Sequence, residues 1–169
     1  MRILFRPQAV LIAVIAGVAA LGGSPALATH TETATVSATV TPAVLSVTAT
    51  PTSVDYGTVE LSATNVTPTP LFFTATNNGS ITENINIRGA DTANWTLENA
   101  VGANQYVHKA SNDNFAIQTI TLVTPGSTLL KASVAVNGTV TVSLKLDAPT
   151  SSTTAATQTA VVTVIAVAP

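Results

Sequence analysis

The chain of 169 residues contains no cysteine, and it has few charged and few aromatic side chains. Without cysteine it forms no disulfide bonds, carries no lipid anchor attached through a thiol, and lacks the thiolate ligands of structural zinc sites. Charged residues make up 8% of the chain and aromatic residues 4%. Side-chain packing and backbone pairing must therefore stabilise the fold.

Basic residues are especially scarce. Residues 29–169 contain four of them against eight acidic residues, which gives a formal charge of −4. Nucleic acid binding requires clustered Lys and Arg that neutralise phosphates, and electrostatic binding to a membrane surface requires a basic patch. We therefore expect neither nucleic acid nor a membrane as a partner.

Residues suited to catalysis are also few. A nucleophilic triad needs a histidine base beside a serine and a carboxylate, but the chain has only His30 and His108 and no Gly-x-Ser-x-Gly elbow. We expect His108 to face solvent from a strand and His30 to lie in a free terminus, with an N-terminal metal site as the alternative for His30. The acidic residues are scattered singly, which disfavours a glycosidase pair. We expect no enzyme activity and no cofactor.

The first 28 residues have the three parts of a secretory signal peptide. Arg2 and Arg6 precede an uncharged apolar run over residues 9–21, and residues 26–28 (Ala-Leu-Ala) form a cleavage site of the small-x-small type. The alternative is a membrane anchor, but a span needs about 20 apolar residues and this run is shorter. We expect cleavage after Ala28 and a secreted protein, extracellular or at the cell surface.

What the chain has in abundance is threonine. Residues 29–169 include 30 Thr together with many Val and Ala, and β-branched side chains favour strands over helices. Stretches that alternate or are apolar, bounded by turn residues, predict strands at residues 33–40, 44–50, 54–61, 71–76, 81–88, 94–98, 105–109, 115–123, 129–136, 140–146 and 160–168. Such spacing indicates an all-β fold, an immunoglobulin-like or jelly-roll β-sandwich of about eight to ten antiparallel strands.

Two of these regions allow more detailed predictions. Residues 71–76 and 81–88 flank the turn sequence Asn77-Asn78-Gly79-Ser80, and Asn and Gly tolerate positive φ, so we expect a β-hairpin there. Between residues 140 and 146, Val and Leu alternate with Thr141, Ser143 and Lys145. The apolar residues should face the core and the polar residues should face outward.

Two short motifs resemble known sequences. Residues 53–59 (SVDYGTV), followed by residues 77–80 (NNGS), resemble a pattern of immunoglobulin-like domains of the ASPM-SPD2-Hydin and major-sperm-protein type, over about residues 43–90. Residues 74–81 are also similar to the NNGS hairpin of TasA and camelysin, the secreted biofilm-fibre proteins of bacteria. Both resemblances imply a binding or structural sandwich.

Oxygen-rich loops offer the best candidates for a metal site. Asn112, Asp113 and Asn114 form one such run and Asp91 precedes another, and Ca²⁺ prefers oxygen ligands of this kind. The spacing does not match an EF-hand loop, and Asn/Asp runs usually form turns, which is the alternative. Glycosylation sequons occur at Asn65, Asn78, Asn94 and Asn137.

The aromatic residues are compatible with a sugar-stacking face or with a core. Sandwich cores commonly use one Trp and a few other aromatic residues, so core packing is the favoured interpretation. The residues concerned are Phe72, Phe73, Trp95, Tyr106 and Phe115.

Two non-catalytic functions remain. The first is a structural subunit that self-associates into a homopolymer, such as an extracellular filament of a biofilm matrix or cell surface; the alternative is a monomeric binding module, an adhesin for carbohydrate or a surface protein. We expect an extended segment at residues 29–42 before a sandwich domain at residues 43–169. Residues 31–41 are either a donor strand hinged at Pro42 or an ordinary first strand. The donated side chains would be Ala34, Val36, Ala38 and Val40.

Overall fold

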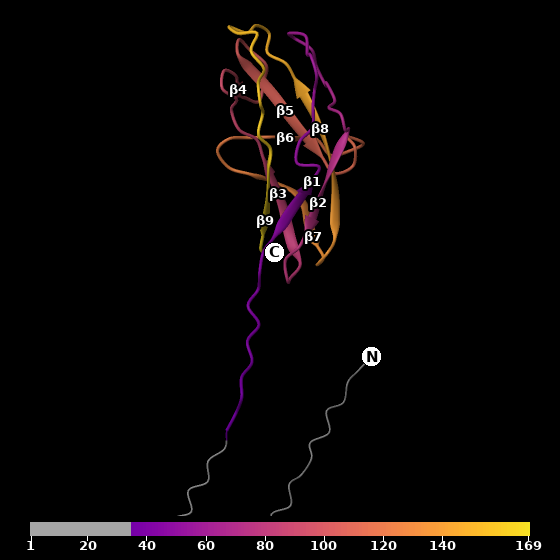
Figure 1. The fold of residues 1–169 in the computed structure, drawn as a ribbon, viewed down its shortest axis with the longest axis vertical. Helices are drawn as coiled ribbons and strands as arrows, with labels where there is room; N and C mark the ends of the chain where they lie inside the picture. The colour runs from indigo at the N-terminus through magenta and orange to yellow at the C-terminus, as the bar shows by residue number, and fades with distance from the viewer. Residues whose placement is uncertain (1–34) are drawn as a thin grey trace, which may run out of the picture. The chain divides into compact units, whose positions relative to one another are not determined.

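The computed structural model describes residues 35–169, so the predicted signal peptide lies outside the described residues. Within this range the chain forms no helix, so it contains no helix long and apolar enough to cross a membrane. Its nine strands form two sheets (Figure 1), which confirms the all-β sandwich. Residues 40–169 make up one compact unit.

The larger sheet has the strand order β1-β2-β8-β5-β4, and β6 also pairs with β5. The smaller sheet has the order β7-β3-β9. Pairing is antiparallel except between β4 and β5, which run parallel, so the expectation of antiparallel strands throughout is wrong at this edge. The strands are β1 (Val47–Thr50), β2 (Phe72–Asn77), β3 (Glu83–Arg88), β4 (Thr96–Leu97), β5 (Gln105–Ser111), β6 (Ile120–Thr121), β7 (Thr128–Val134), β8 (Thr139–Asp147) and β9 (Thr163–Val167).

The core lies between the inner faces of the two sheets. On β8 the predicted alternation is confirmed for the apolar residues, because Val140, Val142, Leu144 and Leu146 are all buried. Ser143 is buried as well, so the expectation that it faces outward is wrong. Its hydroxyl lies 3.3 Å from Oδ1 of Asn114, in the loop that follows β5. This loop supplies the polar partner that a buried hydroxyl needs.

Two predicted strands are absent from the described residues. Residues 35–40 form no strand and are exposed, so they are not the first strand of this sandwich. Residues 54–61 contribute only an isolated bridge between Asp55 and Thr69. Alternation alone therefore overestimates the strands, because a strand also needs a neighbour whose edge is free.

The predicted hairpin at residues 71–88 is wrong. β2 pairs with β1 and β8 in the larger sheet, whereas β3 pairs with β7 and β9 in the smaller one. The turn between β2 and β3 therefore crosses from one sheet to the other. The connection between β7 and β8, at Asn137-Gly138, also crosses between the sheets. We call these two crossings the first and second arch.

The side chain of Asn77, which is fully buried, joins the two arches. Its Nδ2 donates hydrogen bonds of 2.9 Å to the carbonyl oxygens of Ile81 and Val134, and its Oδ1 accepts one of 2.7 Å from the backbone N–H of Gly79. Its backbone N–H donates to the carbonyl of Gly138, and its own carbonyl accepts from Asn137. These bonds use both N–H groups and the carbonyl oxygen of the side-chain amide, and they hold the two arches together.

Gly79 is needed in the first arch for space and not for a positive φ. A β-carbon at this position would collide with the side chain of Glu83 and with the carbonyl oxygen of Val44. Positive φ occurs instead in the second arch, at Asn137, where φ is 60°. The glycine therefore lets the chain before β1 and the side chain of Glu83 pack closely against the first arch.

The alternation on β8 leads to a stability prediction. Leu144→Ala should lower the free energy of unfolding by about 2–5 kcal/mol, through lost transfer energy and a residual cavity. Thr141→Ala, at an exposed position of the same strand, should change it by about 0.5 kcal/mol or less. Urea unfolding of both variants measures the difference, and equal costs would contradict the register.

The side-chain amide of Asn77 leads to a second stability prediction. Asn77→Ala should cost roughly 2–4 kcal/mol, because it leaves buried backbone groups of both arches without partners. Asn78→Ala is the matched control: its exposed amide makes one bond, to Oγ1 of Thr48, and its loss should cost about 1 kcal/mol or less. Similar values for the two variants in urea unfolding would refute the role of Asn77.

Candidate functional site: a groove on the open side of the sandwich

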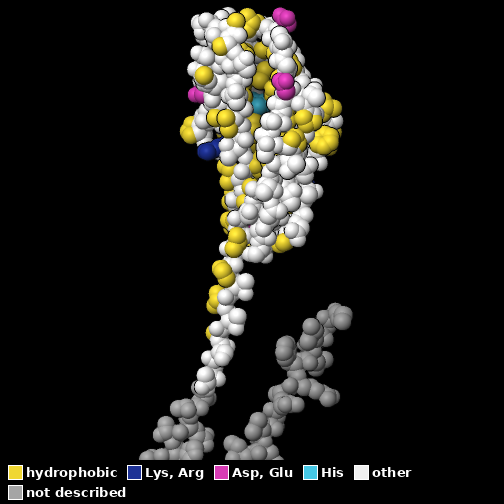
Figure 2. Space-filling model, in the orientation of Figure 1, with side chains coloured by type: hydrophobic (Ala, Val, Ile, Leu, Met, Phe, Trp, Pro, Cys, Tyr) yellow, Lys and Arg dark blue, Asp and Glu magenta, His cyan; other side chains and the backbone are white. Residues whose placement is uncertain are grey.

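A groove of about 1300 Å³ lies between the two sheets on the side of β1 and β9. One wall follows β1 into residues 51–61, and the other consists of residues 152–164, which lead into β9. Figure 2 shows the opening, with apolar side chains and a histidine visible at its bottom. The floor belongs to the larger sheet and consists of Phe73, Tyr106, His108, Leu144 and Leu146.

The groove exists because the two sheets differ in size. The larger sheet has six strands and the smaller only three, so the smaller one does not cover the whole inner face of the larger. β1 and β9 are the outermost strands of their sheets and lie next to each other. Beyond the end of β1 and before the start of β9, irregular segments replace regular strands as the walls.

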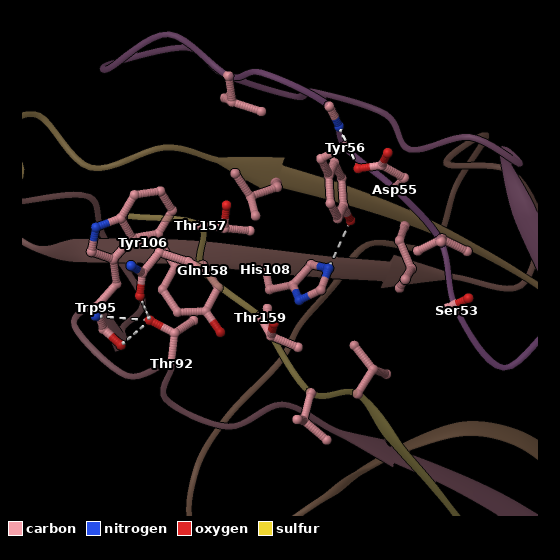
Figure 3. A pocket seen from close by; sticks show the side chains of 18 of the residues that line it. Ser53, Asp55, Tyr56, Thr92, Trp95, Tyr106, His108, Thr157, Gln158 and Thr159 are labelled. Carbon is pink, nitrogen blue, oxygen red and sulfur yellow. Dashed lines mark hydrogen bonds between the residues drawn. The ribbon is translucent and has the colours of Figure 1, made fainter. Parts of the chain in front are cut away.

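The wall that precedes β9 is held by hydrogen bonds up to Gln158 and again from Thr163, where β9 pairs with β3. Trp95 Nε1 donates a hydrogen bond of 3.0 Å to the hydroxyl of Ser152, and the hydroxyl of Thr92 bonds at 2.8 Å to Oε1 of Gln158 (Figure 3). Residues 159–162, by contrast, make no hydrogen bond to any other residue between 35 and 169. Their backbone N–H and C=O groups are thus available to a further strand.

The opposite wall is held by a short bridge. Asp55 and Thr69 exchange backbone hydrogen bonds of 2.9 and 2.7 Å, and the Asp55 carboxylate accepts the N–H of Gly57 at 2.8 Å. Gly57 has a φ of 64° with open space around it, so it forms a turn. This turn places Tyr56 over the floor of the groove (Figure 3).

His108 lies in the floor, so the expectation that it faces solvent is wrong. It is 1% exposed, and its Nε2 shares a hydrogen bond of 2.8 Å with the hydroxyl of Tyr56. Its Nδ1 is buried and has no partner among the described residues. His108 lies on the same face of β5 as Tyr106. The sequence alone does not show that this face is buried, because its burial depends on which segments pack against β5.

The floor of the groove is uncharged at neutral pH. Burial lowers the pKa of His108 to about 4, so its imidazole is neutral. Burial raises the pKa of both tyrosines; that of Tyr106 reaches about 12, with a smaller contribution from Asp91. Asp55 is the only carboxylate among the residues that line the groove, and none of them is basic. The groove therefore suits an apolar, uncharged occupant.

The calcium candidates lie in separate turns, and the carboxylate oxygens among them accept hydrogen bonds from the local backbone. Oδ2 of Asp113 accepts the N–H groups of Ile117 and Gln118, and the Ser111 hydroxyl bonds to Oδ1. These hydrogen bonds lower the pKa of Asp113, and the bond from Ser111 makes the largest contribution. Asp91 accepts the N–H of Leu97. The part of the chain described here holds no cluster of three acidic or histidine residues suited to a metal.

The other candidate residues are dispersed. The four sequon residues Asn65, Asn78, Asn94 and Asn137 are all exposed. Phe73 and Tyr106 are buried, whereas Phe72 is half exposed. The ammonium of Lys145 lies 4.4 Å from the ring centroid of Phe115. Trp95 and Tyr106 line the groove. Of the expected donor residues, Ala34 lies outside the described range, and Val36, Ala38 and Val40 are exposed.

Comparisons with known proteins return nothing for this chain: no family model, no curated protein and no solved structure matches it. The likeness of residues 43–90 to immunoglobulin-like domains, and of residues 74–81 to the fibre proteins, therefore remains a resemblance of short motifs.

The buried imidazole predicts a specific pH dependence of stability. The unfolded chain binds a proton at His108 below pH 6.5, whereas the folded chain does so only near pH 4. Stability therefore falls as the pH drops through this window, by about 2 kcal/mol between pH 7 and pH 5 from this residue. Urea unfolding at both pH values measures the loss. His108→Gln should show a clearly smaller difference, and an unchanged difference in that variant would contradict the assignment.

Proposed function

We propose that this protein is a secreted, non-catalytic structural subunit that assembles into an extracellular homopolymer by β-strand addition. One observation carries the proposal: residues 35–41 alternate apolar and hydroxyl side chains, yet they join no strand of the described sandwich. Val36 is 89% exposed and Val40 is 85% exposed. An alternating segment with this composition suits a sheet, and the sheet to which it adds is proposed to belong to a neighbouring subunit.

Two contributions would make the addition of this segment to a neighbouring sheet favourable: the burial of its valine side chains and the pairing of its backbone groups. Fully burying a valine side chain contributes about 1.5–3 kcal/mol. A strand added to a sheet edge also forms main-chain hydrogen bonds along its length, while alternate side chains provide specificity. Because the donor and the acceptor are different surfaces, the contact is heterologous and produces open filaments instead of closed dimers.

The low charge of the chain favours such an assembly. With four basic and eight acidic residues in positions 29–169, neighbouring subunits repel each other little. Signal-peptide cleavage after Ala28, as the sequence predicts, would free the donor segment only after export. Assembly inside the cell would thereby be avoided.

The alternative function is a monomeric module that binds carbohydrate, and the presence of Trp95 and Tyr106 in the groove favours it. Sugar stacking requires an accessible ring face. Tyr106 is fully buried, and the indole N–H of Trp95 is already bonded to Ser152. The groove thus offers little of the aromatic surface that this function needs.

Negative-stain microscopy of the purified chain that begins at Thr29 tests the proposal. Wild-type protein should form filaments, and deletion of residues 31–41 should abolish them while leaving a folded, soluble monomer. Filaments that persist after the deletion, or a chain that no longer folds, would refute strand donation.

A matched pair of double variants sharpens the test. Val36→Asp with Val40→Asp places two charges on the apolar face of the segment and should prevent assembly, because inserting a charge between sheets is costly. Thr35→Asp with Thr39→Asp places the same charges on the opposite face and should leave filaments in place. Loss of filaments in both variants would mean that charge alone is responsible.

A further inference from the structure

The groove has the properties of an acceptor site for one extended strand. Small-molecule sites usually measure about 300–1,000 Å³, and this groove, at about 1300 Å³, is larger and is bounded by two long walls. Residues 159–164 line one wall and span roughly 20 Å when extended. The seven residues 35–41 have a matching length.

The edges beside the groove are the unprotected edges of the sandwich. Proteins guard free strand edges with charges, with very short strands or with cover. In the described chain β7 carries Lys131, and β4 and β6 have two residues each. β1 and β9 contain no charged residue and lie at the ends of their sheets. Within the described chain, β1 and β9 are therefore the edge strands of more than two residues that carry no charge, and the groove continues from them.

We propose that this groove accepts residues 31–41 of a second copy of the chain, with Val36 and Val40 packed between the two walls, above the buried floor that contains Tyr106 and His108. The inference rests on the proposed function and names its acceptor. Residues 33–41 carry no charge, and the floor carries none at neutral pH either. The hydroxyl side chains of the donor would face outward, and its backbone would pair with residues 159–162.

The polarity of the sandwich makes this contact head-to-tail. The backbone N–H of Val44 bonds to the Ser80 hydroxyl, and that of Ser46 bonds to the Glu83 carboxylate, so the chain enters its own sandwich at the arches. The first residue of β1, Val47, pairs with Asn77 beside the arches, so β1 runs away from them. The first residue of β9, Thr163, pairs with Arg88 at the end of β3 that is far from the arches. The groove lies beyond these far ends of β1 and β9. Each subunit would donate from its arch end and accept at its open end.

The first experiment measures binding of a synthetic peptide of residues 31–41 to the Val36→Asp/Val40→Asp chain, which cannot donate. The peptide should bind and raise the melting temperature of the acceptor, whereas a peptide with the same two substitutions should do neither. Adding Thr159→Arg to the acceptor should weaken binding at least about tenfold, because the bulky charge lies at the groove. Thr119→Arg, at an exposed site outside the groove, is the matched control. Equal peptide binding by both arginine variants would overturn the acceptor assignment.

The second experiment uses the absence of cysteine. An Ala38→Cys chain is mixed with an Ala160→Cys chain, and oxidation should give a disulfide-linked pair that an Ala116→Cys partner does not give. Suppose that deletion of residues 31–41 abolishes filaments, but the cross-link does not form and the Thr159→Arg chain assembles fully. This result would overturn the groove as the acceptor site and leave the proposed function standing. Filaments that survive the deletion would refute the proposed function itself. A cross-link formed within single chains carrying both cysteines at high dilution would show that the segment fills its own groove, and would overturn the second copy as occupant.

Discussion

The side-chain amide of Asn77 is the contact on which the arrangement of the two sheets depends. It satisfies backbone groups of both arches at once, including the carbonyls of Ile81 and Val134. Without these bonds, the buried polar groups at the crossings would be left unpaired, at a cost comparable to a large part of the stability of a small domain. The amide therefore lies where β2 ends and β8 begins in the larger sheet, and where β7 ends and β3 begins in the smaller one.

This closure at one end has a consequence at the other. The arches, the start of β1 and the end of β9 all lie together, and Gly79 allows them to approach closely. Beyond the far ends of β1 and β9, irregular segments form the walls, and one of them is held by the side-chain hydrogen bonds Trp95–Ser152 and Thr92–Gln158. The groove thus forms where these irregular segments, and not strands, lie above Tyr106 and His108, both of which are buried.

The groove and the free segment share the same chemistry. Both are poor in charge and rich in small or β-branched side chains, and both contain backbone without partners between residues 35 and 169. The Tyr56–His108 bond holds one wall over the floor, and burial keeps the imidazole neutral. Because a neutral floor favours an apolar strand and disfavours charged ligands, a copy of the chain's own segment is a consistent occupant.

The sequence by itself determined the class of fold and the inward face of β8, because alternation with a period of two and an excess of β-branched residues are local properties. It did not determine which strands pair. Asn77-Asn78-Gly79-Ser80 is a good hairpin turn by composition, but burial of the Asn77 side chain against β7 turned it into a crossing between sheets. The same holds for His108, whose exposure depends on Tyr56, a residue 52 positions away. Tertiary structure decided these features, because they depend on partners distant in the chain, and local periodicity carries no information about such partners.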